Sequence, residues 1–104
     1  MGLFDVFRSK GPSAATLLQQ NALVVDVRTP AEYRTGHVKG SRNVPLDRLQ
    51  AFVRKEDPEA RPIVTCCASG MRSGRAAKVL KNAGFTVANG GAWSQVERLQ
   101  QRPS

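Results

Sequence analysis

The sequence has little of what a metal site, a membrane span or a disulfide framework requires. Its 104 residues include two cysteines and one histidine, whereas a structural zinc site uses four such ligands. No stretch approaches the roughly 18 apolar residues of a membrane span, and the first residues lack the apolar core of a secretory signal. We therefore expect no metal, no membrane span and a reducing, cytoplasmic setting, where cysteines stay free.

Aromatic residues are scarce throughout the chain, and acidic residues are absent from its residues 60–96. The chain has four Phe, one Tyr and one Trp, and its net charge is +8. Residues 60–96 contain no Asp or Glu but contain these basic residues: Arg61, Arg72, Arg75, Lys78 and Lys81. A basic domain can bind nucleic acid. Without a binding motif or an aromatic platform, we expect no nucleic acid, and the charge serves either solubility or the attraction of a small anionic substrate.

A chain of this length is expected to form a single domain. We place that domain at residues 13–100, between a leader at 1–12 that ends in Gly-Pro and a short tail at 101–104. The leader contains the apolar and basic segment MGLFDVFRSK. Its role is open: it is either a mobile end or a segment that lies on a membrane surface or a partner.

Strand and helix patterns alternate along the domain. Apolar or β-branched runs predict strands at 22–27, 61–67 and 85–89, with a short strand near 42–44. Helical patterns are expected at 13–20, from 29 onward, and at 45–56, 73–84 and 91–101. Such alternation is typical of an α/β fold with parallel strands. The strand at 85–89 is expected to be short, and the pair Gly90–Gly91 is expected to mark a turn beside the site.

Helix caps can be assigned from the residue types at the expected helix starts. Thr29 is the expected N-cap of a helix with Pro30 at its first position, and Glu32 completes a capping box. Ser13 and Ser73 are the expected N-caps of two other helices.

Both cysteines lie in the stretch TCCASGMRSG, residues 65–74. Counted from Cys66 to Arg72 the spacing is C-x5-R, and counted from Cys67 it is C-x4-R. The stretch lies between a predicted strand and a predicted helix. Because ligands of open α/β sheets bind beyond the carboxyl ends of the strands, this loop is the expected site.

A cysteine in this position is expected to ionise easily. Backbone N–H groups at a glycine-containing turn before a helix bind anions, and the helix dipole adds positive charge. An ordinary thiol titrates near ~8.5, and such surroundings lower that value, more so beside Arg72. The thiolate is the nucleophile, so the expected substrate carries negative charge and an electrophilic centre.

The two cysteines are not equivalent, because neighbouring residues of a strand point to opposite faces. Cys66 is expected to complete the strand as a buried apolar residue, whereas Cys67 opens the loop. A third interpretation is that Cys66 resolves an oxidised Cys67, although a disulfide between neighbours is strained.

Three stretches resemble the signatures of the rhodanese-like domain family. They occur in the family's order within residues 14–98 and read VVDVRTPAEYRTGHVKGSRNVP, VTCCASGMRSGRAAKVLKNAGF and VANGGAWSQV. The resemblance implies a three-layer α/β fold, with a mainly parallel central sheet and helices on both faces. It also implies a thiosulfate sulfurtransferase that requires no metal or organic cofactor.

By the same resemblance Cys67 is the catalytic residue. It would take a sulfane sulfur from a small anionic donor such as thiosulfate, hold it as a persulfide and pass it to a thiophilic acceptor, cyanide in the usual assay. The resemblance implies that Arg72 binds the donor and that backbone N–H groups surround the persulfide. The implied binding residues are Ala68, Ser69, Gly70, Met71, Arg72 and Ser73.

The family resemblance gives other polar residues supporting roles. Asp26 and Arg28 end the neighbouring strand and are implied to organise loops through hydrogen bonds and ion pairing. Glu32 is the expected ion-pair partner of Arg28, and His37 is expected to be structural.

Two alternatives stay open. One is a sulfur-relay module that binds a protein sulfur acceptor and turns over small donors slowly. The other is a phosphatase or arsenate reductase, although those relatives use a loop one residue longer than the one that Cys67 opens. The oligomeric state and the physiological donor and acceptor are not determined by the sequence.

Overall fold

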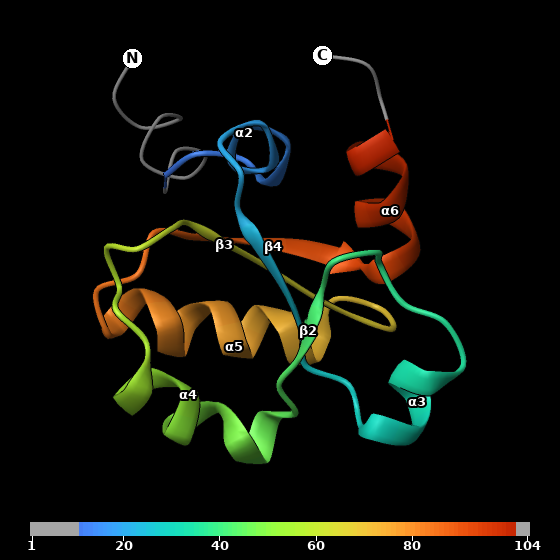
Figure 1. Cartoon of the computed structure of the whole chain (residues 1–104), viewed down its shortest axis with the longest axis horizontal. Coiled ribbons are helices and arrows are strands. Elements are labelled where there is room, and N and C mark those ends of the chain that lie inside the picture. Colours follow the sequence, from blue (N-terminus) through green and yellow to red (C-terminus); the bar gives the residue numbers. More distant parts are fainter. Residues whose placement is uncertain (1–10, 102–104) are drawn as a thin grey trace.

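One parallel sheet forms the middle of the molecule. The computed structural model describes residues 11–101, and its strands are β1 (Leu23–Asp26), β2 (Arg42–Asn43), β3 (Ile63–Cys67) and β4 (Val87–Ala92). They lie in the order β2-β1-β3-β4 and every pairing is parallel, so β1 and β3 are central (Figure 1). These two strands are apolar because helices cover both of their faces.

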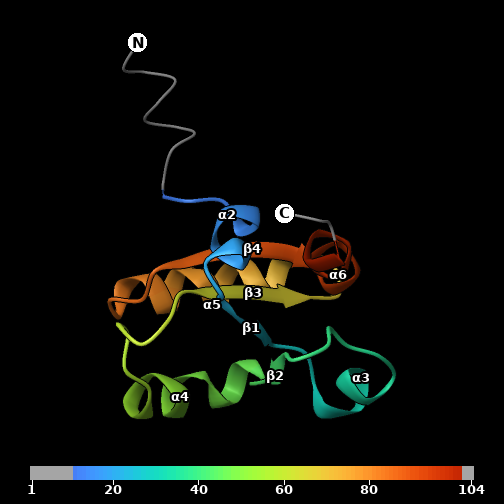
Figure 2. The ribbon, with the colours of Figure 1, turned by 45° about the horizontal axis from the view of Figure 1, so that its top comes forward.

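The helices form a layer on each side of the sheet. Helices α2 (Ala14–Gln19) and α6 (Trp93–Gln101) contribute to one buried cluster, and α4 (Leu49–Lys55) and α5 (Met71–Asn82) contribute to the other (Figure 2). Helix α3 (Pro30–Arg34) and the 3-10 turn η1 (Leu46–Arg48) lie in the connections that follow β1 and β2. The predicted three-layer α/β fold is thereby confirmed.

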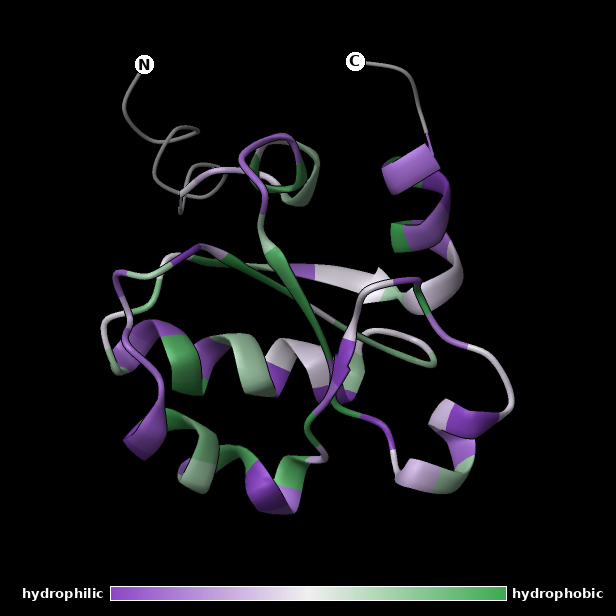
Figure 3. Cartoon of the chain, in the orientation of Figure 1, coloured by the Kyte–Doolittle hydropathy of each residue, from purple (hydrophilic) through white to green (hydrophobic). Residues whose placement is uncertain are grey.

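Alternation along β3 divides its side chains between the two cores. Ile63 and Cys67 pack with α4 and α5, whereas Val64 and Cys66 pack with α2 and α6. Figure 3 shows the hydrophobic stretch along β1 and the alternating hydrophobic and hydrophilic bands of the helices that cover the sheet. The sheet alternation therefore places the two adjacent cysteines on opposite faces, as expected from strand geometry.

The predicted leader falls mostly on residues outside the described part of the chain, as does most of the predicted tail. Within residues 11–101, no helix combines the length and the apolarity needed to cross a membrane.

Two of the predicted helix caps are confirmed, and one is wrong. The Ser13 side chain accepts a hydrogen bond from the Thr16 amide, and Thr29 and Glu32 form the complete capping box. Helix α5, however, begins at Met71 after Gly70, not after Ser73. Gly70 has a left-handed backbone (φ 105°) that turns the chain into the helix early, and the Ser73 side chain is buried instead of capping.

The prediction of a turn at Gly90–Gly91 is also wrong, because β4 continues through both glycines to Ala92. The pairing with β3 is irregular here: Thr65 pairs with Asn89 and Cys67 pairs with Ala92. Gly91 has a left-handed backbone (φ 81°) at this irregularity. The extra residue in β4 is accommodated as a bulge, which glycine permits at low cost.

Gly90 is required by close packing. A Cβ atom at this position would lie 2.4 Å from Val96 Cγ2, 2.8 Å from Val64 Cγ1 and 2.9 Å from the Thr65 carbonyl oxygen. The backbone of β4 can therefore approach β3 and α6 only where no side chain intervenes.

We expect Gly90→Ala to lower the free energy of unfolding by about 1–3 kcal/mol, the usual cost of overpacking a core. Chemical denaturation followed by circular dichroism measures it. Gly74→Ala is the matched control, since an added Cβ there meets only the Asn89 side-chain amide, at 3.2 Å. Its cost should be offset by the roughly 1 kcal/mol by which alanine exceeds glycine in helix propensity. Equal destabilisation by both substitutions would contradict the packing explanation.

Candidate active site

Cys67 is the last residue of β3, at the carboxyl edge of the parallel sheet. Its side chain is 1% exposed. The loop that follows, here called the cysteine loop (residues 67–72), turns at Gly70 into α5. The strand thus extends one residue further than Cys66, and Cys67 both ends the strand and opens the loop.

The Cys67 sulfur lies within the first turn of α5. The Gly70 amide donates a hydrogen bond to it at 3.0 Å and the Ser73 amide at 3.4 Å, while the thiol itself donates to Ser73 Oγ at 3.3 Å. Within the described chain, no hydrogen bond joins this sulfur to the amides of Ala68, Met71 or Arg72. Their expected contact with the outer sulfur of a persulfide stays a prediction.

The two neighbouring thiols have opposite acidities. Burial raises the pKa of the Cys67 thiol. The Ser73 hydroxyl and the amides of Ser73, Gly70 and Ser69 favour its thiolate more strongly, so its pKa lies below the ordinary value. For Cys66, burial first and the charge of Asp26 second raise the pKa to about 12. Of the two thiols, Cys67 is therefore the one that ionises more readily.

Asn89 on β4 supports the cysteine loop, a role that the sequence did not reveal. Its Oδ1 accepts hydrogen bonds from Ser73 Oγ at 2.7 Å and from the Gly91 amide at 2.9 Å, and its Nδ2 donates to the Gly70 carbonyl at 3.2 Å. The only signal in the sequence is a polar residue directly before two glycines at the end of a strand. Asn89 thereby fixes the position of the two residues, Gly70 and Ser73, whose groups contact the Cys67 sulfur.

The loop and β4 also approach each other closely. A Cβ added to Gly70 would lie 3.3 Å from Gly91 Cα, and the left-handed backbone of Gly70 disfavours a side chain independently. Glycine at this position lets the loop fold down over the sulfur.

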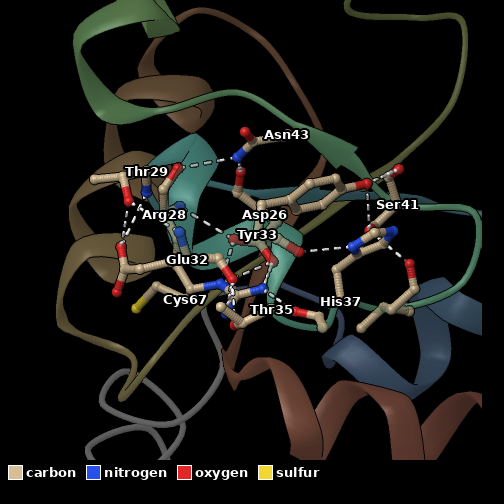
Figure 4. Close-up of polar contacts among 12 residues, drawn as sticks. Asp26, Arg28, Thr29, Glu32, Tyr33, Thr35, His37, Ser41, Asn43 and Cys67 are labelled. Carbon is tan, nitrogen blue, oxygen red and sulfur yellow. Dashed lines mark hydrogen bonds and ion pairs between the residues drawn. The ribbon is translucent and has the colours of Figure 1, made fainter.

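Arg28 forms a buried ion pair with Asp26, not with Glu32 as expected. Its Nε lies 2.9 Å and 3.0 Å from the two Asp26 carboxylate oxygens, and its Nη2 lies 2.7 Å from Oδ2 (Figure 4). Arg28 also donates to the carbonyl oxygens of Gly36 and Glu32 and lies 5.0 Å from the Trp93 ring. Since Asp26 has already neutralised this guanidinium, the Glu32 side chain takes a different partner.

That partner is Arg72 of the cysteine loop. Arg72 Nη1 lies 2.7 Å from Glu32 Oε1, and Nη2 lies 3.0 Å from Oε2. The sequence predicted that Arg72 would lower the pKa of the Cys67 thiol directly. In the structure its guanidinium bonds the carboxylate, and the hydrogen bonds that stabilise the thiolate come from Ser73 and the backbone.

His37 lies away from the sulfur, in the connection after α3. Its ring stacks on that of Tyr33 at a centroid distance of 3.7 Å, and its Nδ1 lies 2.8 Å from the Tyr33 carbonyl oxygen (Figure 4). The Tyr33 hydroxyl donates to the Ser41 carbonyl at 2.7 Å. These contacts fix the connection, and they agree with the structural role expected of His37.

A groove of about 760 Å³ lies beside the cysteine loop, at the carboxyl edge of β1 and β2. Its walls are apolar and polar residues with two guanidinium groups and one carboxylate, and they include Val27, Pro45, Leu46, Asp47, Arg48 and Arg72. Arg72 is the member of this lining that belongs to the cysteine loop. The groove therefore connects the cysteine loop to a surface that carries charges of both signs.

The protein family and the individual relatives that resemble this chain are of the same kind. The rhodanese-like domain family matches residues 12–94. The chain is 36% identical over 83 residues to the thiosulfate sulfurtransferase GlpE of Pseudomonas paraeruginosa, a match that covers 79% of this chain and 74% of the relative. It is 40% identical over 67 residues, or 64% of its length, to the uncharacterized protein YqhL of Bacillus subtilis. This second match spans about half of that relative, 52% of its length.

Solved structures show the same architecture. A rhodanese-related protein from Thermoplasma volcanium superposes with a TM-score of 0.70 at 25% identity, covering 89% of this chain and 94% of that one. A rhodanese with anions from E. coli superposes with a TM-score of 0.62 at 30% identity, covering 71% and 89%. Since the family match spans most of the sequence and the fold superposes on solved members, the chain belongs to the rhodanese-like domain family.

Proposed function

We propose that the protein is a sulfurtransferase that carries a sulfane sulfur as a persulfide on Cys67. The observation that carries the proposal is the environment of the Cys67 sulfur, where the Gly70 and Ser73 amides and the Ser73 hydroxyl surround it. These dipoles favour the thiolate over the thiol, and they are suited to hold a small anion at the same place.

The first half-reaction is an attack of the thiolate on the outer sulfur of thiosulfate. A bond forms between Cys67 Sγ and that sulfur, and the bond from it to the sulfonate sulfur breaks. Sulfite leaves with the bonding electron pair, and Cys67 holds a persulfide with one negative charge. No proton transfer or external oxidant is required.

The second half-reaction returns the enzyme to its thiolate. Cyanide attacks the terminal persulfide sulfur, the sulfur–sulfur bond breaks, and thiocyanate leaves while the electron pair returns to Cys67. The amides of the cysteine loop serve both steps, since they stabilise a negative sulfur before transfer, during transfer and after it.

The relatives support this assignment at the level of reaction class. GlpE of P. paraeruginosa is named a thiosulfate sulfurtransferase, and the E. coli rhodanese structure contains anions. In this chain the groups suited to an anionic donor are the amides that contact the Cys67 sulfur. Arg72 lines the adjoining groove and can take part in donor binding, although Glu32 shares its charge.

A second candidate is a sulfur-relay module whose acceptor is another protein. The observation that favours it is Met71, which lies at the start of α5 beside the cysteine loop and is 76% exposed, although it is large and apolar. Such a side chain suits contact with a partner surface. A relay module would form the persulfide on Cys67 but would transfer it to cyanide slowly.

Exchange of Cys67→Ser should reduce thiocyanate formation from thiosulfate and cyanide by at least about a thousandfold, because the nucleophile is removed. Cys66→Ser is the matched control, since it makes the same change one residue away on the opposite face of the sheet. Intact mass after thiosulfate treatment should show one added sulfur atom in the wild-type protein and in Cys66→Ser, but none in Cys67→Ser. Loss of the added sulfur only in Cys66→Ser would reverse the assignment.

A steady-state assay of the same proteins separates the two candidates. A persulfide that forms fully while thiocyanate production stays slow would favour the relay module over the stand-alone enzyme.

Phosphate-ester hydrolysis should be absent. The loop from Cys67 closes amides directly on a single sulfur atom, so we expect p-nitrophenyl phosphate to be hydrolysed no faster by the wild-type protein than by Cys67→Ser. Release of nitrophenol that depends on Cys67 would contradict the proposed reaction class.

The pH dependence of Cys67 alkylation should show the effect of the Ser73 hydroxyl on the pKa of Cys67. Because the pKa of Cys67 lies below that of an ordinary thiol, its thiolate persists to lower pH, and iodoacetamide should modify it there. Ser73→Ala removes a group that lowers this pKa, so the alkylation profile should shift to higher pH. Mass spectrometry measures the modified fraction.

Ser69→Ala is the control for that shift, because it removes a nearby hydroxyl but keeps the Ser69 amide that acts on the sulfur. Its profile should match the wild-type profile. Equal shifts in both variants would mean that the Ser73 hydroxyl has no specific effect on the thiolate.

A further inference from the structure

The ion pair between Glu32 and Arg72 joins two parts of the chain that are 40 residues apart. It connects α3, which follows β1, to the first turn of α5, which follows the cysteine. Both nitrogen–oxygen distances, 2.7 Å and 3.0 Å, belong to one two-pronged contact. The side chains are 34% and 37% exposed, so a solute can reach them.

The Glu32 carboxylate has further hydrogen-bond donors within its own helix start. Its Oε1 accepts hydrogen bonds from the Thr29 amide at 2.9 Å and from the Thr29 hydroxyl at 3.2 Å. Hydrogen bonding by Arg72 first and by the Thr29 amide second lowers the pKa of Glu32 to about 2. The carboxylate is therefore charged at neutral pH.

Arg72 is thus not a free cation in the site. Its guanidinium lies close enough to Cys67 for the two to interact electrostatically, and it lines the groove beside the cysteine loop. However, the guanidinium edge that would bind a sulfonate in a two-pronged manner already binds a carboxylate. An incoming anion must share Arg72 with Glu32 or displace it.

We propose that Glu32 is a specificity-determining residue, which compensates the charge of Arg72 and so limits the affinity of the site for doubly charged donors. The inference rests on the proposed function, since it concerns the donor of the same site. Repulsion between Glu32 and the donor grows with the donor's charge. With Glu32 present, the site therefore prefers a dianionic donor over a monoanionic one less strongly than it would if Arg72 were uncompensated.

Two donors that differ by one charge can test this. Thiosulfate is a dianion: its outer sulfur is transferred to Cys67, and the remainder leaves as sulfite. Benzenethiosulfonate is a monoanion: the Cys67 thiolate attacks its outer sulfur, the sulfur–sulfur bond breaks, and benzenesulfinate leaves with the electron pair. Both reactions leave the same persulfide on Cys67, so only the recognition of the donor differs.

The test compares Glu32→Gln with the matched control Glu56→Gln in the full-length chain. Glutamine still accepts the hydrogen bond that completes the capping box, so the helix start is kept while the charge is removed. Glu56 also pairs with an arginine, Arg42, at 2.7 Å, and its side chain is 36% exposed. The two variants therefore lose the same charge and the same kind of contact.

We expect Glu32→Gln to lower the KM for thiosulfate by about two- to fivefold, the range of an exposed ion-pair contact. The kcat should change little, and the KM for benzenethiosulfonate should fall less. Glu56→Gln should leave both constants within about twofold, because exposed charges away from the site are screened.

Protection by sulfate gives a readout that needs no turnover. Sulfate is an unreactive dianion, and the concentration that halves alkylation of Cys67 by iodoacetamide should fall in Glu32→Gln by the same factor as the KM. If the wild-type protein transfers no sulfur, the proposed function fails, but this measurement still decides the role of Glu32.

Three results would overturn the inference. A raised KM together with a lowered kcat in Glu32→Gln would mean that the residue only supports the structure of the loop. Equal effects on the two donors would remove the dependence on donor charge. Equal effects of Glu32→Gln and Glu56→Gln would mean that net charge alone is responsible.

Discussion

The buried ion pair between Asp26 and Arg28 organises the carboxyl edge of the sheet. Arg28 follows β1 two residues after its end and binds Asp26. Its guanidinium also donates to the carbonyl oxygens of Glu32 and Gly36 and lies over the ring of Trp93 at the start of α6. A buried pair of this kind adds little net stability over apolar packing, yet loss of one partner typically costs about 3–5 kcal/mol. Its main effect here is positional, because it fixes the segments that surround the cysteine loop.

Asp26 of this ion pair helps to make two adjacent thiols chemically different, although Arg28 acts on Cys66 in the opposite direction. Asp26 pairs with Cys66 across β1 and β3, and its charge adds to burial in opposing a Cys66 thiolate. Cys67 points to the other face, where the Gly70 and Ser73 amides meet its sulfur. Strand alternation therefore separates a thiol that stays protonated from one that ionises, and a reaction at one sulfur need not involve the other.

Sequence patterns predicted the parts of the molecule that depend on local chemistry. The central strands, the capping box of Thr29 and Glu32, and the position of the cysteines at a strand end all follow from residue type and spacing over a few positions. The predicted start of α5, at Ser73, lies two residues after the observed start. The Ser73 side chain makes hydrogen bonds with Cys67 and Asn89, so it does not cap the helix. Contacts across 16 or 40 residues, such as those of Asn89 and Arg72, have no short-range signal in the sequence.

Neutral dipoles and full charges have separate tasks in this site. Amide and hydroxyl groups contact the Cys67 sulfur itself, and they stabilise the thiolate without attracting ions over a distance. The charge of Arg72 lies at the edge, where Glu32 compensates it. Since the backbone of the loop is fixed by Gly70 and Asn89, chemistry at the sulfur and recognition of the donor can change independently: exchange of Glu32 or Arg72 alters which anions arrive, while the groups that make the sulfur reactive stay in place.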